Sequence, residues 1–329
     1  MGEFELLARI RERIPAGGAR IVLGSGDDAA VTVPEGATAT SVDAVVDGVH
    51  FHRDQATPAQ IGHKALATAL SDLAAMGAEP GEAYVTLGLP PDFGEDECIE
   101  LLDGLLALAA ATGTSLAGGD LTRSATLFLA IAVVGHAPTA AALVSRGGAR
   151  PGDALILTGE LGGAAAGLAL LDADTSVDPP RVGSTLASAL IKRQLEPQPR
   201  LAAGRALARA GVTAMIDISD GLGGDAGHLA AASGVGLHID AGTLPRPTGL
   251  DELAGELGRD PWQLLLSGGE DYELLASVPT ERLEQAIEAV RKAEGIALTR
   301  IGEVVAGSGI EIRLPDGGLA DPGGFDQLA

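Results

Sequence analysis

The segment at residues 214–225, AMIDISDGLGGD, decides the fold expected for this chain, because it joins a buried apolar strand to a helical pattern at 226–232. The carboxylates of Asp217, Asp220 and Asp225 therefore crowd one strand-to-helix turn. Two like charges about 4 Å apart repel by roughly 4 kcal/mol at an effective dielectric constant near 20. Asp217 and Asp220 are thus costly neighbours unless a cation lies between them. The alternative interpretation is a solvated turn in which Asp220 caps the helix.

Other acidic residues stand in similar places, beside glycines or at the ends of predicted elements. They occur in the segments Gly26-Asp27-Asp28, Ser41-Val42-Asp43, Ser71-Asp72 and Gly118-Gly119-Asp120. If these carboxylates converge, a group of hard divalent cations is the simplest way to neutralise them. Mg²⁺ held by carboxylates usually serves a phosphate substrate, so the pattern predicts magnesium and a phosphorylated ligand.

Composition narrows the class of protein. The chain has 329 residues, 46% of them hydrophobic, with 47 glycines, 18 prolines and a net charge of -23. These values are typical of a turn-rich α/β protein and argue against nucleic acid or an anionic membrane as a partner. Cys98 is the single cysteine, which excludes an internal disulfide and favours a cytoplasmic location. We expect no signal peptide and no membrane helix.

The chain is long enough for two domains. The Pro/Gly-rich segment at 147–153 is the best boundary, so we expect an N-terminal domain at 1–148 and a C-terminal domain at 149–329.

In the first half, a strand at 38–46 directs Ser41 and Asp43 to one face, because residues two apart in a strand point the same way. His50 follows in a loop, either as a surface residue or as a contact to substrate phosphate. Thr57-Pro58 begins a helix that we expect to end close to Gly77 as its C-cap, so Asp72 lies near the C-terminus. A negative charge there opposes the helix dipole, which favours a functional role for Asp72.

Two other motifs, at 118–120 and at Phe325, each allow two interpretations. Gly118-Gly119-Asp120 permits close approach of a phosphate, or it is a glycine-rich connection to the next strand. The adjacent acids of the turn at 267–273 are interpreted as solvated. Phe325 either stacks on a ligand or anchors the C-terminal tail.

The set of motifs resembles the thiamine-monophosphate kinase family, within the superfamily of aminoimidazole ribonucleotide synthetase. The resemblance is carried, in family order, by the segments 26–29, 41–43, 64–67, 71–77, 118–120, 217–221 and 267–274. It implies a two-domain α/β fold with mixed sheets flanked by helices, and a homodimer. It also implies transfer of the ATP γ-phosphate to thiamine monophosphate, giving thiamine diphosphate.

The resemblance also implies a role for individual residues. The Mg²⁺ ligands would be Asp28, Ser41, Val42 through its carbonyl, Asp43, Asp72, Asp120, Asp217 and Asp220. ATP would contact Gly119, Asp120, Arg146 and Ser219, and thiamine monophosphate would contact His50, Glu270 and Phe325. Some members have an aromatic residue before the strand that ends in Gly118-Gly119-Asp120, whereas this chain has Ala111-Thr112-Gly113, a departure from the family pattern at the place where adenine would stack.

The implied mechanism is direct in-line transfer with no covalent nucleophile. Two alternatives stay open. One is a sibling ATP-dependent enzyme of the same superfamily, and the other is a non-catalytic protein that binds Mg-ATP or other phosphate ligands.

Overall fold

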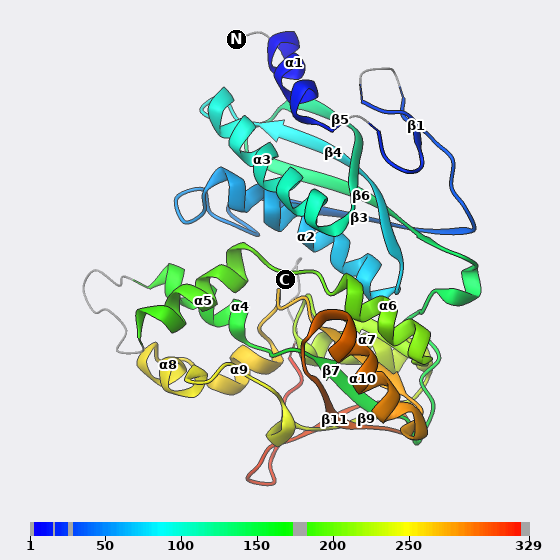
Figure 1. Cartoon of the computed structure of the whole chain (residues 1–329). Helices are drawn as coiled ribbons and strands as arrows, with labels where there is room; N and C mark the ends of the chain where they lie inside the picture. The colour runs from blue at the N-terminus through cyan, green and yellow to red at the C-terminus, as the bar shows by residue number, and fades with distance from the viewer. Residues whose placement is uncertain (1–2, 16, 26–28, 174–182, 324–329) are drawn as a thin grey trace. The chain divides into compact units, whose positions relative to one another are not determined.

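The computed structural model describes residues 3–15, 17–25, 29–173 and 183–323, and these form two compact units. The first contains the described parts of 1–73 and 78–140, and the second those of 74–77 and 141–329 (Figure 1). Both are mixed sheets flanked by helices, so the predicted α/β class is confirmed. The expected boundary after Gly148 stays a prediction. Within the described residues, no helix combines the length and the apolar character needed to cross a membrane.

The first unit is built on a four-stranded sheet with the order β3-β6-β4-β5. Its elements are α1 (Glu3–Arg13), β1 (Ile21–Leu23), β2 (Val31–Thr32), β3 (Ala37–Val46), α2 (Pro58–Ala75), β4 (Glu79–Leu89), α3 (Glu95–Thr112), β5 (Ser115–Arg123) and β6 (Phe128–Ala137). β1 and β2 pair separately as a two-stranded sheet. β3 and β5 are thus the two edges of the main sheet.

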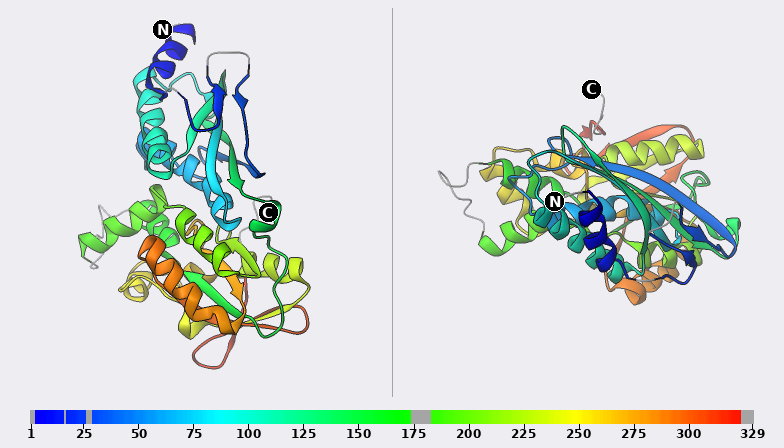
Figure 2. Two further views of the ribbon diagram at one scale, coloured as in Figure 1. Left: turned by 45° about the vertical axis from the view of Figure 1, so that its right-hand side comes forward. Right: turned by 90° about the horizontal axis from the view of Figure 1, so that it is seen from above.

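Helices α2 and α3 cover one face of this sheet (Figures 1 and 2). On that face β6 contributes Leu129, Ile131 and Val133, which are at most 1% exposed. The two helices meet through glycines. A Cβ atom on Gly104 of α3 would overlap the Ala59 carbonyl oxygen of α2, and one on Gly62 of α2 would overlap a carbonyl oxygen of α3. The helix crossing therefore requires two residues without side chains.

Local signals fix both ends of α2 as the sequence predicts. The Thr57 hydroxyl accepts a hydrogen bond from the Gln60 amide at 3.3 Å, and the Gln60 side chain accepts one from the Thr57 amide at 3.0 Å. This reciprocal pair is a capping box. After the helix, Gly77 has φ +65°, the left-handed conformation expected of a C-terminal glycine.

The segment Gly118-Gly119-Asp120 differs from its interpretation as a connection. It lies inside β5, which runs parallel to β4 with Gly118 opposite Tyr84 and Asp120 opposite Thr86. The pairing shifts register between Ala83 and Tyr84. The strand continues through the glycines because β4 supplies hydrogen-bond partners about thirty residues away in the chain, which no local signal reveals.

The second unit contains a seven-stranded sheet with the order β13-β12-β9-β11-β7-β10-β8. Its elements are β7 (Ala154–Thr158), α4 (Gly163–Asp172), α5 (Ser184–Leu195), α6 (Leu201–Ala210), β8 (Ala214–Asp217), α7 (Leu222–Ser233), β9 (Gly236–Asp240), α8 (Leu250–Glu256), α9 (Pro261–Leu266), β10 (Leu274–Val278), α10 (Leu283–Glu294), β11 (Leu298–Val305), β12 (Gly309–Arg313) and β13 (Leu319–Ala320). β12 pairs with β9 in parallel, and the other paired strands are antiparallel.

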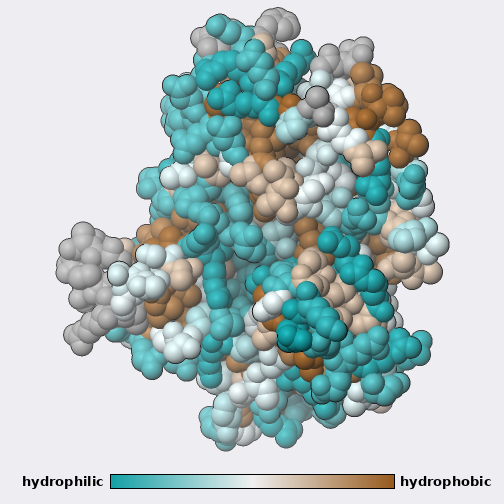
Figure 3. All heavy atoms as spheres, in the orientation of Figure 1, coloured by the Kyte–Doolittle hydropathy of each residue, from teal (hydrophilic) through white to brown (hydrophobic). Residues whose placement is uncertain are grey.

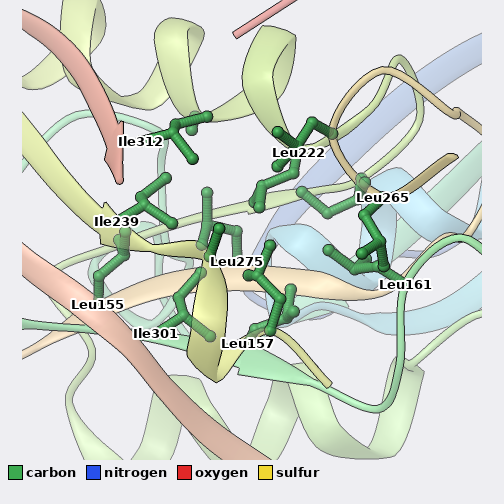
Figure 4. Packing of buried hydrophobic residues seen from close by; sticks show 14 of the residues in the cluster. Leu155, Leu157, Leu161, Leu222, Ile239, Leu265, Leu275, Ile301 and Ile312 are labelled. Atoms are coloured by element: carbon green, nitrogen blue, oxygen red, sulfur yellow. The ribbon is translucent and has the colours of Figure 1, made fainter. Parts of the chain in front are cut away.

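The core of the second unit lies against one face of its sheet (Figure 4). Leu155 and Leu157 of β7 and Leu275 of β10 pack there with Leu222 of α7 and Leu265 of α9, all fully buried. Burying one such side chain stabilises the fold by about 1.5–3 kcal/mol, so this cluster holds β7, β8 and β10 firmly. The loops that follow these strands therefore start from fixed positions.

We expect Gly104→Ala to destabilise the first unit by about 1–3 kcal/mol, because the new methyl group has no space at the crossing of α2 and α3. Gly255→Ala in α8 is the matched control, since a Cβ there meets nothing within 4 Å. Thermal and urea unfolding of both variants measures the difference. Equal stabilities of the two variants would contradict a requirement for glycine at the crossing.

Candidate active site

Ser41, Asp43 and Asp72 meet between β3 and α2. Ser41 and Asp43 pair with Val133 and Ile131 of β6, whose side chains lie on the helix-covered face. The Ser41 hydroxyl donates a hydrogen bond to the Asp72 carboxylate. Burial raises the pKa of Asp43 to about 6, and the negative charge of Asp72 and a hydrogen bond with it act in the same direction. Two carboxylates in contact form a site that favours a cation.

Val42 and Asp120 point to the other face of the sheet. Val42 pairs with Ala132 of β6, and its side chain is 66% exposed. Asp120 pairs with Thr86 of β4, and it is also exposed. Because side chains alternate along a strand, neither shares the helix-covered face with Asp43.

The strand order also separates Asp120 from Asp43 within one chain. Asp120 lies on the edge strand β5 and Asp43 on the opposite edge strand β3, with β4 and β6 between them. Three strand spacings correspond to about 14 Å. That distance is too long for the two carboxylates to hold the same metal ion, so the sheet of one chain does not bring this predicted pair together.

The packing of β5 against β4 requires a glycine at position 119, independently of any role in binding. A Cβ atom at this position would overlap the Val85 carbonyl oxygen, so β5 and β4 approach closely only with glycine there. The residue's exposed backbone still leaves it available to a ligand. The predicted ATP contact at Gly119 stays a prediction.

His50 lies in the turn after β3. Its ring nitrogen Nδ1 accepts a hydrogen bond from the Val46 amide at 3.2 Å, and its own amide donates to the Val46 carbonyl at 2.9 Å. The bond at Nδ1 leaves the proton of a neutral ring on Nε2. His50 is therefore oriented by its backbone, with one ring nitrogen suited to donate.

In the second unit, Asp217 ends β8 and Ser219 and Asp220 follow it. Asp225 holds this turn, because its carboxylate accepts hydrogen bonds from the amides of Ser219 and Asp220, each at 3.0 Å. Gly221, with φ +100°, is the N-cap of α7 and no side chain caps it. The alternative in which Asp220 caps the helix is therefore wrong, and Asp225 takes a role that the sequence analysis did not assign.

These carboxylates are crowded as the sequence predicts. Burial raises the pKa of Asp225 to about 8, and the charge of Asp217 adds to the effect. Burial also raises the pKa of Asp220, although the charges of His228 and Arg146 oppose this change. The turn thus concentrates negative charge that the backbone amides offset only in part.

Arg146 lies near this turn. It lowers the pKa of Asp220 by its positive charge. The backbone beside it is fixed, since the Met215 amide donates to the Ser145 carbonyl at 3.0 Å and the Ser233 hydroxyl donates to the Arg146 carbonyl at 3.1 Å. An exposed guanidinium beside Asp220 is well suited to a phosphate group.

Glu270 also adjoins the turn. Its amide donates to the Ser219 carbonyl at 2.8 Å, and a Cβ atom on the preceding Gly269 would overlap that same carbonyl oxygen. The Glu270 side chain accepts a hydrogen bond of 2.6 Å from Gln194 of α5. The structure thus brings the predicted substrate contact Glu270 next to the predicted ATP contact Ser219.

The other acids of this loop are not solvated, so their interpretation from sequence was wrong. Asp271 accepts hydrogen bonds from the amides of Gly162 and Ala164 at the start of α4, at 2.7 and 3.1 Å. Burial nevertheless raises the pKa of Asp271 to about 7. Glu273 is 3% exposed and pairs with Arg200. Both carboxylates fix the chain immediately after Glu270.

The carboxylates of the described residues could supply only some of the ligands of a magnesium ion. In the described part of the chain, no three His, Cys, Asp or Glu side chains gather closely enough to hold a metal ion. Mg²⁺ commonly binds through one or two carboxylates together with water and substrate phosphates, so the pair Asp43 and Asp72 is sufficient for such a site. The predicted ligand Asp28 and the predicted substrate contact Phe325 lie outside the described residues.

The sequence and the fold match known proteins over most of the chain. Residues 26–137 match the model of the AIR synthase related protein N-terminal domain, and residues 150–315 match the corresponding C-terminal domain. Thiamine-monophosphate kinase of Escherichia coli K12 is 41% identical over 311 residues, covering 93% of this chain and 91% of that protein.

Two solved structures agree. The crystal structure of thiamine-monophosphate kinase from Stenotrophomonas maltophilia K279a superposes with a TM-score of 0.83 and 36% identity, covering 97% of this chain and 98% of that one. AaThiL complexed with AMPPCP and TMP superposes with a TM-score of 0.76 and 29% identity, covering 98% and 96%. The chain therefore belongs to the thiamine-monophosphate kinase family of AIR synthase related proteins.

Proposed function

We propose that this protein transfers the γ-phosphate of ATP to thiamine monophosphate, giving thiamine diphosphate and ADP. Family membership supports the reaction, and the complex of AaThiL with an ATP analogue and TMP supports the pair of substrates. The observation that carries the proposal in this chain is the contact between Ser41, Asp43 and Asp72. The repulsion between two such carboxylates destabilises the fold when no cation is bound, and a bound cation relieves it.

Asp43 and Asp72 would hold Mg²⁺ at the first unit, with Ser41, the Val42 carbonyl and Asp28 as further ligands. Asp120 would join them only from a second copy of the chain, since the two edges of one sheet are too far apart. Asp217 and Asp220 would hold Mg²⁺ at the second unit. Bound Mg²⁺ supplies charge neutralisation for the phosphates as the bond to the γ-phosphate breaks and the new one forms.

The remaining residues would bind and orient the two substrates. Gly119, Asp120, Arg146 and Ser219 would position ATP, while His50, Glu270 and Phe325 would position thiamine monophosphate. Catalysis then consists of alignment and electrostatic stabilisation, with the acceptor phosphate attacking in line. No side chain serves as a covalent nucleophile, so a phosphorylated residue detected during turnover would contradict this mechanism.

Phosphorus NMR of the protein with Mg-ATP and thiamine monophosphate tests the reaction itself. We expect thiamine diphosphate to appear in step with ADP. Intact ATP would favour a binding protein, and ADP without thiamine diphosphate would favour a sibling enzyme with another substrate.

We expect Asp72→Asn to lower kcat/KM by on the order of 100-fold, because loss of one electrostatic contact to the transferred group typically costs this much. The protein should fold normally or become slightly more stable without Mg²⁺, since the substitution removes the repulsion with Asp43. Steady-state kinetics and thermal unfolding give the two values.

Asp96→Asn is the matched control, because the Asp96 side chain on α3 is 98% exposed and outside the site. It makes the same change of charge on a helix and should leave kcat/KM unchanged. If Asp72→Asn retained the activity of Asp96→Asn, Asp72 would have no role in holding magnesium.

We also propose a homodimer formed through the first unit. Most of the exposed large hydrophobic residues among those described lie there: Val22, Leu23, Val31, Val33, Val42 and Val49. Figure 3 shows hydrophobic side chains gathered over the region of β1. Exposed apolar surface of this kind marks an interaction site. A second copy would also supply an Asp120 close to Asp43 if β5 of one chain lay beside β3 of the other.

The dimer proposal makes a complementation prediction. Asp43→Asn and Asp120→Asn should each be inactive alone, whereas co-expression of the two variants should restore about a quarter of wild-type activity. Half of the random dimers would be mixed, and each mixed dimer would contain one intact site. Activity of the purified mixture, normalised to dimer content by light scattering, measures the recovery.

Co-expression of Asp43→Asn with Asp72→Asn is the control, because these residues act from the same chain and every site of the mixed dimer would be damaged. Equal activity in the two mixtures would show that Asp43 and Asp120 do not serve one site from different chains.

We further propose that the domain at 1–148 supplies most of the ATP and metal contacts named above, and that the domain at 149–329 supplies the other metal ligands and most of the substrate contacts. A cytoplasmic location is consistent with Cys98, which is free and buried.

A further inference from the structure

Gln194 is held in place by the close packing of α5 on α4. It lies in the last turn of α5 and is 4% exposed. A Cβ atom on Gly167 of α4 would overlap the Leu190 carbonyl oxygen and would lie 3.1 Å from the Gln194 Cβ. The two helices therefore approach closely at this point, and the Gln194 side chain has little freedom to turn away from its partner.

That partner is Glu270, to whose carboxylate the Gln194 Nε2 group donates at 2.6 Å. The orientation of the amide follows from chemistry, since the amide oxygen would be repelled by the carboxylate oxygen it faced. Glu270 itself has φ +65°, a conformation that a residue with a side chain adopts only when its surroundings impose it. Backbone bonds at Ser219 fix the main chain of Glu270, and Gln194 fixes its carboxylate.

The amide oxygen of Gln194 indicates that the residue is not present for the stability of the fold. Its Oε1 atom is buried, and no donor in the described structure bonds to it. An unpaired buried carbonyl destabilises a fold, and an apolar side chain of the same length would avoid that cost. Among the described residues, Glu270 is the only hydrogen-bond partner of the Gln194 side chain.

We propose that Gln194 is a positioning residue for substrate recognition, which presents the Glu270 carboxylate to the exocyclic amino group of the pyrimidine ring of thiamine monophosphate. This inference rests on the proposed function. A carboxylate accepts hydrogen bonds from such an amino group, and the direction of those bonds requires an oriented carboxylate. Gln194 supplies that orientation from outside the contact.

Kinetics of Gln194→Met with two substrates test the role. Oxythiamine monophosphate carries an oxygen in place of the amino group, so it lacks the donor. The wild type should prefer thiamine monophosphate strongly, because a site built for a hydrogen bond rejects an analogue without it. In Gln194→Met, KM for thiamine monophosphate should rise roughly tenfold and the preference should shrink by roughly the same factor. The value of KM for ATP should not change.

Gln198→Met is the matched control, since Gln198 is exposed and bonds to the Glu196 carbonyl. It should retain the wild-type preference. Thermal unfolding checks the fold, and Gln194→Leu serves as a second variant if Gln194→Met is unstable. A purely structural role would lower the rates with both substrates equally and leave the preference unchanged, which would overturn the inference. A wild type that phosphorylates neither substrate would instead refute the proposed function, and the inference with it.

Discussion

The paired hydrogen bonds between Arg200 and Glu273 are the interaction on which the polar loops of the second unit depend. The guanidinium donates to Glu273 at 2.5 and 2.8 Å and to Glu294 of α10 at 3.0 Å. Thr158 at the end of β7 donates to the same Glu273 at 2.7 Å. Removal of one partner from such a buried pair typically costs 3–5 kcal/mol, because a charge is left without compensation. The pair therefore fixes the start of β10 relative to β7 and α6.

Hydrogen bonds to amides hold several carboxylates of the neighbouring loops in place, although like charges repel one another. Glu270 and Asp271 precede β10, and each carboxylate is bonded to an amide. Asp225 uses backbone amides of the neighbouring turn in the same way. In the first unit a hydroxyl group, that of Ser41, takes the equivalent position beside Asp72. Neutral donors thus orient the acids near both proposed metal sites.

The sequence predicted the features that local signals determine. The ends of α2 followed from Thr57 and Gly77, and the shared face of Ser41 and Asp43 followed from strand alternation. Features that depend on distant partners were missed. One of the two interpretations placed Gly119 in a connection, but the residue lies in β5. The separation of Asp120 from Asp43 depends on strand order. The bonds of Asp225 to the turn before it and of Gln194 to Glu270 were also missed, because these partners meet only in the folded chain.

The close crossing of α2 and α3 at Gly62 and Gly104 has a consequence for the site as well as for stability. It fixes the rotation of α2 about its own axis, and Asp72 lies ten residues further along the same helix. Each residue of an α-helix turns the chain by about 100°. A single insertion or deletion between Gly62 and Asp72 would swing the carboxylate away from Ser41, although the helix itself would tolerate the change. The length of this stretch is therefore constrained as strictly as the identity of its aspartate.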